Sequence, residues 1–201
     1  MELNPKIKIG DKTVLYGPNG AGKSYLIHSK LQEHLETGSA ILITESYVKQ
    51  FNVSVFTPDE FNLADWFAIF DPAVAKRLYL EVYYDRAYDP DRGWVPLKNL
   101  SYGQRRRLAI EAALETGDFV AIENFEAGLH ADYVAELIKQ IAESDASIML
   151  ETHSTLVLRL AMRYGLNTYY VEEGGVVKPI ERLDDVGLFQ RELAAYQAVV
   201  V

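Results

Sequence analysis

Short apolar runs alternate along the chain with longer segments in which apolar residues recur every three to four positions. The apolar runs predict strands at 6–9, 13–16, 40–44, 119–122, 147–151 and 168–171. The periodic segments predict helices at 23–36, 103–115, 133–144 and 155–164. Regular alternation of strands and helices predicts an α/β fold, in which helices cover both faces of a mostly parallel sheet.

Residues 46–99 interrupt this alternation, because they are rich in aromatic residues and Asp and show no regular period. Within them we expect helices over 65–84 and an irregular loop at 88–96. The length of 201 residues suits one core. We therefore predict a single domain over 1–201, with 46–99 as a small lobe inserted into it.

Composition limits the classes of function. The chain has no cysteine, which excludes disulfides and thiolate chemistry, and its net charge of −9 disfavours a non-specific grip on nucleic acid. Arg105, Arg106 and Arg107 form one short basic run, which we interpret as the solvated side of a helix, with a nucleic-acid contact as the alternative. No apolar stretch is long enough to span a membrane and no signal peptide is evident, so we expect a cytoplasmic protein.

A glycine-rich octapeptide between the strand at 13–16 and the helix at 23–36 fits the phosphate-binding pattern G-x-x-x-x-G-K-[ST]. Its residues are Gly17, Pro18, Asn19, Gly20, Ala21, Gly22, Lys23 and Ser24. Glycines let backbone N–H groups converge on an anion, and the helix start adds its own N–H groups. Lys23 is expected to reach the β- and γ-phosphates of a nucleotide, Ser24 to hold Mg²⁺, and the adjacent Tyr25 to border the site.

The segment 100–104, Leu-Ser-Tyr-Gly-Gln, precedes the basic helix. Ser101 is suited to cap that helix, and a capped helix start can also bind an anion, so in isolation a plain cap and an anion site are equally good interpretations. Downstream of a phosphate loop, however, the segment resembles the signature motif of ABC-type ATPases.

Two later segments extend this resemblance. The apolar run 119–122 ends in Glu123 and Asn124, where the family's Walker B strand carries Asp-Glu, and the strand at 147–151 leads to His153 at the switch-histidine position. Two sequences resemble the RecF/SMC and OLD-nuclease side of the family: Ile-Glu-Asn-Phe-Glu-Ala-Gly-Leu-His at 122–130 and Glu-Thr-His-Ser at 151–154. The resemblance covers about residues 10–171 and implies a P-loop NTPase core of ABC ATPase type.

For the bound nucleotide the resemblance implies ATP with Mg²⁺. Lys23 would stabilise charge on the β–γ bridge, and Ser24 and Glu123 would hold the metal ion. Gln50 is the best candidate for the further metal-binding glutamine of the family. His153 would contact the γ-phosphate, although a histidine satisfied at a strand end is the plainer alternative.

The resemblance also implies a partner. Ser101, Gly103 and Gln104 of one subunit would close over ATP held by the phosphate loop of another, giving a head-to-tail homodimer. His130 has the character of an exposed loop residue, so a structural or subunit-contact role is expected for it.

Asn124 departs from the family pattern, because rapidly hydrolysing members carry a glutamate there as general base. An amide orients water but accepts no proton, and loss of a general base costs on the order of 10²–10⁴ in rate. We therefore expect slow hydrolysis, unless Glu126, through a bend at Phe125, or Glu151 serves as the base.

Three functions remain open from sequence. The first is an ATP-dependent dimerising switch of the RecF/SMC/OLD-like class, whose output a partner protein supplies. The second is the ATPase subunit of an ABC membrane transporter, favoured by the well-formed signature at 100–104. A small-molecule kinase is the third, and it leaves both the signature and His153 unexplained.

Overall fold

The computed structural model describes residues 12–35, 40–44, 54–56, 82–83, 86–89, 93–96 and 99–199. The strand predicted at 6–9, the residue Gln50 and most of the lobe predicted at 46–99 lie outside these residues.

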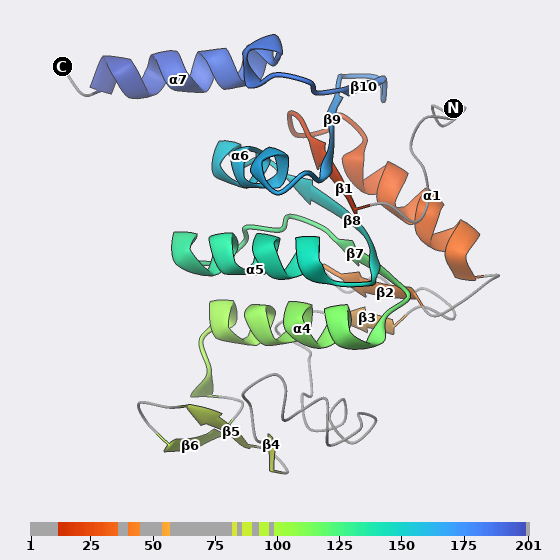
Figure 1. The fold of residues 1–201 in the computed structure, drawn as a ribbon, viewed down its shortest axis with the longest axis vertical. Coiled ribbons are helices and arrows are strands. Elements are labelled where there is room, and N and C mark those ends of the chain that lie inside the picture. The colour runs from red at the N-terminus through yellow and green to blue at the C-terminus, as the bar shows by residue number, and fades with distance from the viewer. Residues whose placement is uncertain are drawn as a thin grey trace.

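A seven-stranded sheet organises the molecule (Figure 1). Its strands, in chain order, are β1 (Lys12–Tyr16), β2 (Ala40–Ile43), β3 (Ser54–Phe56), β7 (Phe119–Ile122), β8 (Ser147–Thr152), β9 (Asn167–Val171) and β10 (Val177–Pro179). Across the sheet the order is β10-β9-β1-β8-β7-β2-β3. All neighbours are parallel except β10, which runs antiparallel to β9. Strand β8 therefore lies between β1 and β7, although it follows both in the sequence.

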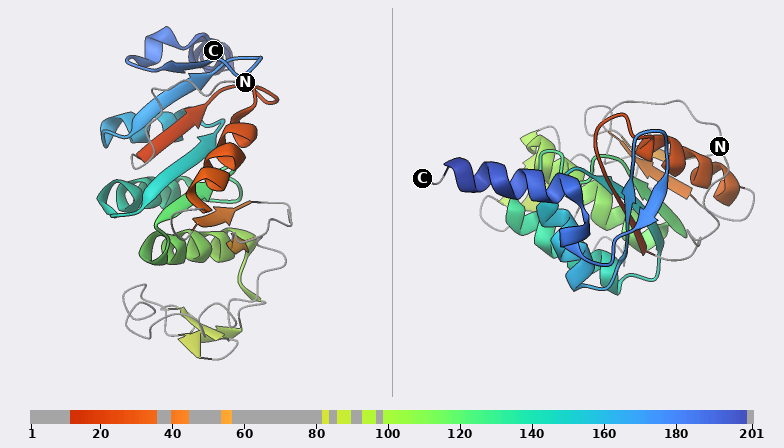
Figure 2. Two further views of the ribbon diagram at one scale, coloured as in Figure 1. Left: turned by 90° about the vertical axis from the view of Figure 1, so that its right-hand side faces the viewer. Right: turned by 90° about the horizontal axis from the view of Figure 1, so that it is seen from above.

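Helices cover both faces of the sheet, as the two views of Figure 2 show. They are α1 (Lys23–Leu35), α4 (Tyr102–Thr116), α5 (Ala131–Glu143), α6 (Thr155–Arg163) and α7 (Gly187–Val199), with the short 3₁₀ helix η2 (Leu183–Asp185) before α7. Helix α1 packs on one face, whereas α4, α5 and α6 pack on the other. The predicted α/β class, a mostly parallel sheet between helical layers, is confirmed.

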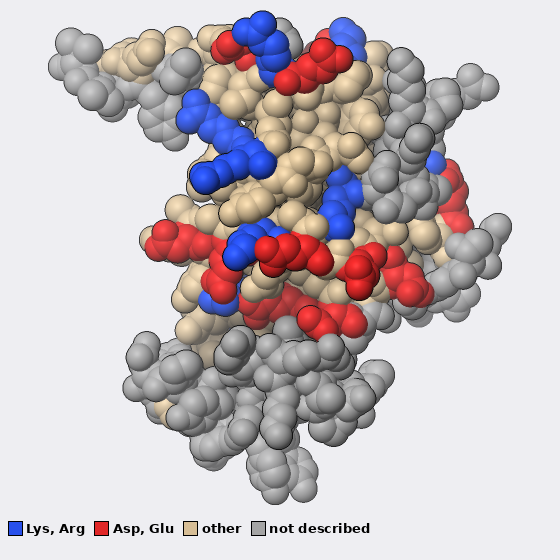
Figure 3. Space-filling model, in the orientation of Figure 1, with Lys and Arg blue, Asp and Glu red and all other residues tan. Residues whose placement is uncertain are grey.

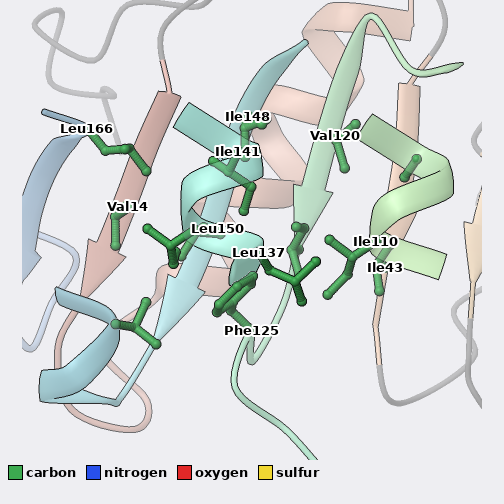
Figure 4. Close-up of a cluster of buried hydrophobic side chains, with 14 of the residues drawn as sticks. Val14, Ile43, Ile110, Val120, Phe125, Leu137, Ile141, Ile148, Leu150 and Leu166 are labelled. Atoms are coloured by element: carbon green, nitrogen blue, oxygen red, sulfur yellow. The ribbon is translucent and has the colours of Figure 1, made fainter. Parts of the chain in front are cut away.

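Side-chain alternation along the strands builds the two layers. Val14 faces the α4–α6 side and its neighbour Leu15 faces α1, and Ile148 and Met149 divide in the same way. Such strands are apolar at nearly every position, which is why a continuous run rather than a period of two marked them in the sequence. The larger cluster, on the α4–α6 side, includes Phe125, which is fully buried just after β7 (Figure 4).

Observed bounds of the predicted core helices and strands differ from the expected ones by two residues or fewer. The prediction failed at 82–96. There β4 (Val82–Tyr83), β5 (Arg86–Asp89) and β6 (Gly93–Pro96) form a separate antiparallel sheet, where a helix end and an irregular loop were expected. Strands β5 and β6 pair antiparallel, with Asp89 opposite Gly93, whose φ of +74° suits glycine. Whether 46–99 is a separate lobe stays a prediction.

Two glycines allow the start of α4 to touch the turn after β7. A Cβ on Gly103 would run into the carbonyl oxygen of Gly128, and a Cβ on Gly128 would run into the ring of Tyr102. Gly128 also has a φ of +68°, which other residues rarely adopt. The start of α4 and the turn therefore pack backbone against backbone.

We predict that Gly103→Ala lowers the free energy of unfolding by about 2 kcal/mol or more, because neither backbone can move away cheaply. For a domain of this size that corresponds to a fall in Tm of roughly 4–8 °C. Thermal unfolding followed by circular dichroism measures it. Gly187→Ala, at the start of α7, is the matched control, because a Cβ there meets no atom within 4 Å. Equal Tm values for the two variants would contradict the packing described.

Candidate functional site

The glycine-rich loop joins the end of β1 to the start of α1. Gly20 and Gly22 have φ values of +76° and +99°, and a Cβ on Gly17 would run into the carbonyl oxygen of Val171. Lys23 is 4% exposed, and its Nζ donates to the carbonyl oxygens of Gly17 at 3.0 Å and Pro18 at 2.8 Å. The loop thus curls around a buried ammonium group, which is the geometry that a phosphate cradle needs.

The other residues of the loop and of the first turn of α1 differ in exposure. Asn19 and Ser24 are exposed, Ala21 is buried, and Tyr25 leaves 61% of its surface in contact with solvent. The ring of Tyr25 at the first turn of α1 therefore borders the loop and is not part of the core.

The ends of β7 and β8 bring two carboxylates to the start of α1. The Ser24 Oγ donates to Glu151 Oε2 at 2.8 Å, and His28 Nε2, one turn along α1, lies 2.7 Å from Glu123 Oε1. Glu151 belongs to β8 and is paired in register with Leu15 of β1, whereas Glu123 directly follows β7. The oxygen donors of Ser24, Glu123 and Glu151 are those that Mg²⁺ prefers.

Charges in this region perturb one another. Burial raises the pKa of Glu151, and the charge of Glu123 adds to that effect, whereas the hydrogen bond from Ser24 and the charge of Lys23 oppose it. Burial lowers the pKa of Lys23, and the charges of Glu151 and Glu126 oppose that shift. A cation between the carboxylates relieves the cost of keeping both ionised.

Among the described residues, no group of three or more His, Asp or Glu side chains is arranged to hold a metal ion. Mg²⁺ is commonly held by one or two carboxylates together with substrate phosphates and water. The donor set of Ser24, Glu123 and Glu151 fits that kind of site, completed by a bound phosphate.

A bend after β7 turns Glu126 towards the end of β8. Asn124 has a φ of +48°, and the N–H of Phe125 donates to the carbonyl oxygen of Glu151 at 3.0 Å. The Glu126 carboxylate then accepts hydrogen bonds from Thr152 Oγ1 at 2.7 Å and from the N–H of His153 at 2.9 Å. The bend at Phe125 that was needed to bring Glu126 inwards is therefore present, and both carboxylate oxygens are already engaged there.

Arg106 corrects the interpretation of the three arginines as a solvated helix side. It is fully buried, and its Nη2 donates to the carbonyl oxygens of Glu123 at 2.6 Å and Asn124 at 2.9 Å. The sequence carries no signal for this, because residues 108 to 113 are all buried and helical spacing does not distinguish Arg106 from its two neighbours. Arg107 pairs with Glu111 at 2.8 Å and with Glu136 at 3.1 Å.

On the face that carries α4 to α6, Lys and Arg are interspersed with Asp and Glu, so the described residues form no continuous basic stripe there (Figure 3).

The start of α4 is closed by a capping box. Gln104 N donates to Ser101 Oγ at 3.2 Å, and Ser101 N donates to Gln104 Oε1 at 3.0 Å. Ser101 is exposed, and α4 packs on β2 and α5, while β8 and β7 separate β2 from β1. The plain cap is therefore real, and the segment 100–104 lies across the sheet from the strand that carries the phosphate loop.

His130 and His153 differ in their surroundings. His130 is exposed, caps the start of α5 and lies 3.3 Å from Asp132 through its Nδ1, in agreement with a structural role. His153 is half-buried directly after β8, with its backbone held by Glu126.

Among the described residues, no helix is both long and apolar enough to cross a membrane.

Comparison with known proteins identifies the family. Residues 40–159 match the family described as "AAA domain, putative AbiEii toxin, Type IV TA system". A "Putative ABC transporter ATP-binding protein" of Bacillus cereus is 27% identical over 208 residues, covering 92% of this chain and 36% of that protein. One of Bacillus anthracis is 25% identical over 198 residues, covering 87% and 34%. The chain thus spans about a third of the length of these curated relatives.

Solved structures share the fold at lower identity. One is cbiO1 of Clostridium perfringens, described as part of the ABC transporter complex cbiONQ. It superposes with a TM-score of 0.59 at 19% identity, covering 98% of this chain and 84% of that one. The ABC transporter cassette MJ0796, described as dimeric, gives 0.56 at 16% identity, covering 88% of each chain. The core has the fold of these ATP-binding cassettes.

Proposed function

Because the chain belongs to the family of P-loop ATPase domains described as "AAA domain, putative AbiEii toxin, Type IV TA system", we propose that it is an ATP-dependent dimerising switch that hydrolyses ATP slowly. The observation that carries the proposal is the buried Lys23 amine inside the glycine-rich loop, next to the hydrogen bond between Ser24 and Glu151. A partner protein supplies the output of the switch.

Lys23 and the loop N–H groups bind the triphosphate in this proposal. On binding, the Lys23 ammonium exchanges the carbonyl oxygens of Gly17 and Pro18 for the more strongly attracting β- and γ-phosphate oxygens. Ser24 and Glu123 hold Mg²⁺, which when bound neutralises charge on those phosphates. His153 senses the γ-phosphate from the end of β8.

Slow turnover follows from the residues around the attacking water. Asn124 orients that water without accepting its proton. Glu126 is the alternative base, but its carboxylate already accepts two hydrogen bonds from Thr152 and His153. We assign Glu126 to holding His153 in place, and we expect no residue to provide full general-base catalysis.

Dimerisation follows from the exposed start of α4. Ser101, Gly103 and Gln104 lie across the sheet from the strand that carries the phosphate loop. In a head-to-tail pair, these residues of one subunit close over the ATP of the other. The cassette MJ0796, which shares the fold, is described as dimeric, and this supports a dimer.

A transporter subunit is the second candidate, because the curated relatives from Bacillus are named ABC transporter ATP-binding proteins. The two candidates differ in the partner. Affinity purification from membrane extract and from membrane-free extract separates them: recovery of integral membrane proteins supports the transporter, whereas recovery of DNA-processing proteins supports the switch.

We predict that Lys23→Ala abolishes binding of Mg-ATP, because the variant loses the only buried cation of the loop among the described residues. Isothermal calorimetry measures the affinity, and circular dichroism checks the fold. Lys139→Ala removes an equal charge from the exposed side of α5 and should leave the affinity unchanged. Wild-type affinity in the Lys23 variant would remove the basis of the assignment.

We predict that saturating Mg-ATP converts the monomer to a dimer, and that Ser101→Arg prevents this by placing a long cation where the partner's nucleotide binds. Multi-angle light scattering with and without ATP measures the change in mass. Ser101→Ala is the control, because it loses the same helix cap, at a cost of about 1 kcal/mol, without adding bulk. Dimerisation of the Arg variant, or a wild type that stays monomeric, speaks against the proposed head-to-tail dimer.

We predict that Asn124→Glu raises the single-turnover rate of ATP hydrolysis by at least about tenfold, a cautious part of a usual general-base effect. ATP affinity should change little, since a base acts mainly in the transition state. Asn124→Gln is the matched control, because it has the same length without the carboxylate. If Glu126 is the base instead, Asn124→Glu does little and Glu126→Gln stops hydrolysis.

A further inference from the structure

The proposed function gives the carboxylate of Glu151 no chemical role. Glu151 is 7% exposed, and its Oε2 accepts the Ser24 Oγ–H at 2.8 Å. Its backbone is fixed on both sides, because Glu151 is paired in register with Leu15 of β1 and its carbonyl oxygen accepts the N–H of Phe125. Such a fixed carboxylate at the mouth of a phosphate loop is close to whatever Ser24 holds.

The sheet brings Glu151 and Glu123 side by side. Strands β7 and β8 are parallel neighbours, with Ile122 paired to Leu150, so the next residues along the two strands are Glu123 and Glu151. Parallel neighbours lie roughly 4.8 Å apart. Met149 of β8 packs on the same side as α1, and Glu151, two residues later, points to that side as well.

We propose that Glu151 is a second carboxylate ligand of the metal ion that accompanies ATP, acting together with Glu123 and Ser24. This inference rests on the proposed ATP site. A hydroxyl and two carboxylates supply three hard oxygen donors, and a nucleotide's phosphate oxygens complete the set that Mg²⁺ accepts. The Glu151 carboxylate is directed to the Ser24 hydroxyl, so in this proposal Glu151 is a metal ligand and not the general base.

Two carboxylates make nucleotide binding depend strongly on the metal ion. Without a metal, the triphosphate approaches two negative side chains and is repelled by both. With a divalent cation between them, the same side chains attract the complex. The ratio of the ATP dissociation constant in EDTA to that in Mg²⁺, here the metal-coupling ratio, measures this effect separately from hydrolysis.

Calorimetric titration of the full chain with the non-hydrolysable analogue AMP-PNP, in EDTA and in Mg²⁺, tests the inference on wild type and Glu151→Gln. The glutamine keeps the size and an oxygen that accepts from Ser24, but it loses the charge. We expect the metal-coupling ratio to fall at least about tenfold, comparable to the loss of a residue that supports a metal site. Affinity in EDTA should stay equal or improve.

Glu111→Gln is the matched control, because Glu111 is also 7% exposed and hydrogen-bonded, to Arg107 and Gln140 of the opposite helical layer. Its metal-coupling ratio should equal that of wild type. If Glu151→Gln fails to fold by circular dichroism, Glu151→Ser, a smaller uncharged side chain, is titrated with the same expectation. Titration with Mn²⁺, read by the loss of its free-ion electron paramagnetic resonance signal, checks metal binding to the AMP-PNP complex directly.

The outcomes separate the two levels of proposal. A metal-coupling ratio within about twofold of wild type in Glu151→Gln, with normal analogue binding, overturns the role of Glu151 as a metal ligand. Glutamine could then take its place, which is expected of a residue that only orients Ser24. That result leaves the ATP site standing. Failure of the wild type to bind the analogue in either condition overturns the ATP site itself.

Discussion

The contacts of the candidate site converge on the carboxyl end of strand β8, which lies between the strand of the phosphate loop and strand β7. Glu151 reaches Ser24 on one side, and its carbonyl oxygen holds the bend after β7 on the other. Thr152 and His153, the next residues, bind Glu126. With another strand order, the phosphate loop would lie apart from the bend at 123–126, here called the acidic bend. The parallel pairing of β1, β8 and β7 is therefore the constraint from which the rest of the site follows.

Arg106 connects that site to the exposed start of α4. A buried guanidinium is costly unless its donors are paired, and here two donations go to the backbone of Glu123 and Asn124. The same helix begins at the capping box of Ser101 and Gln104, five residues or fewer from Arg106 in the sequence. Helix α4 therefore contacts the acidic bend and also carries the surface proposed to meet a partner subunit. A displacement of α4 on dimerisation would act directly on the backbone that carries Glu123.

The sequence predicted the layers of the core because buried parallel strands are continuous apolar runs and the covering helices are periodic. It also located the glycine-rich loop, whose residue types follow from backbone geometry. The pairing of β5 with β6 was missed because the many polar residues of 86–96 look like a loop in the sequence. The contacts of Ser24 with Glu151, and of Glu126 with His153, join residues 127 and 27 positions apart, and no local pattern records such distances. Arg106 was misread because three successive arginines suggest a surface, and the residues that follow do not mark which arginine is buried.

In the proposed site the acidic side chains serve binding and positioning, and none serves proton transfer. Glu123 and Glu151 are proposed to share the metal ion, Glu126 is held by two hydrogen bonds at the end of β8, and Asn124 stands where a base is expected. Such a distribution strengthens the dependence of nucleotide binding on the metal while leaving the attacking water weakly activated. A transporter subunit needs each ATP to be hydrolysed so that the transport cycle proceeds, whereas a switch needs the bound state to persist. The chemistry of these four side chains therefore favours the switch.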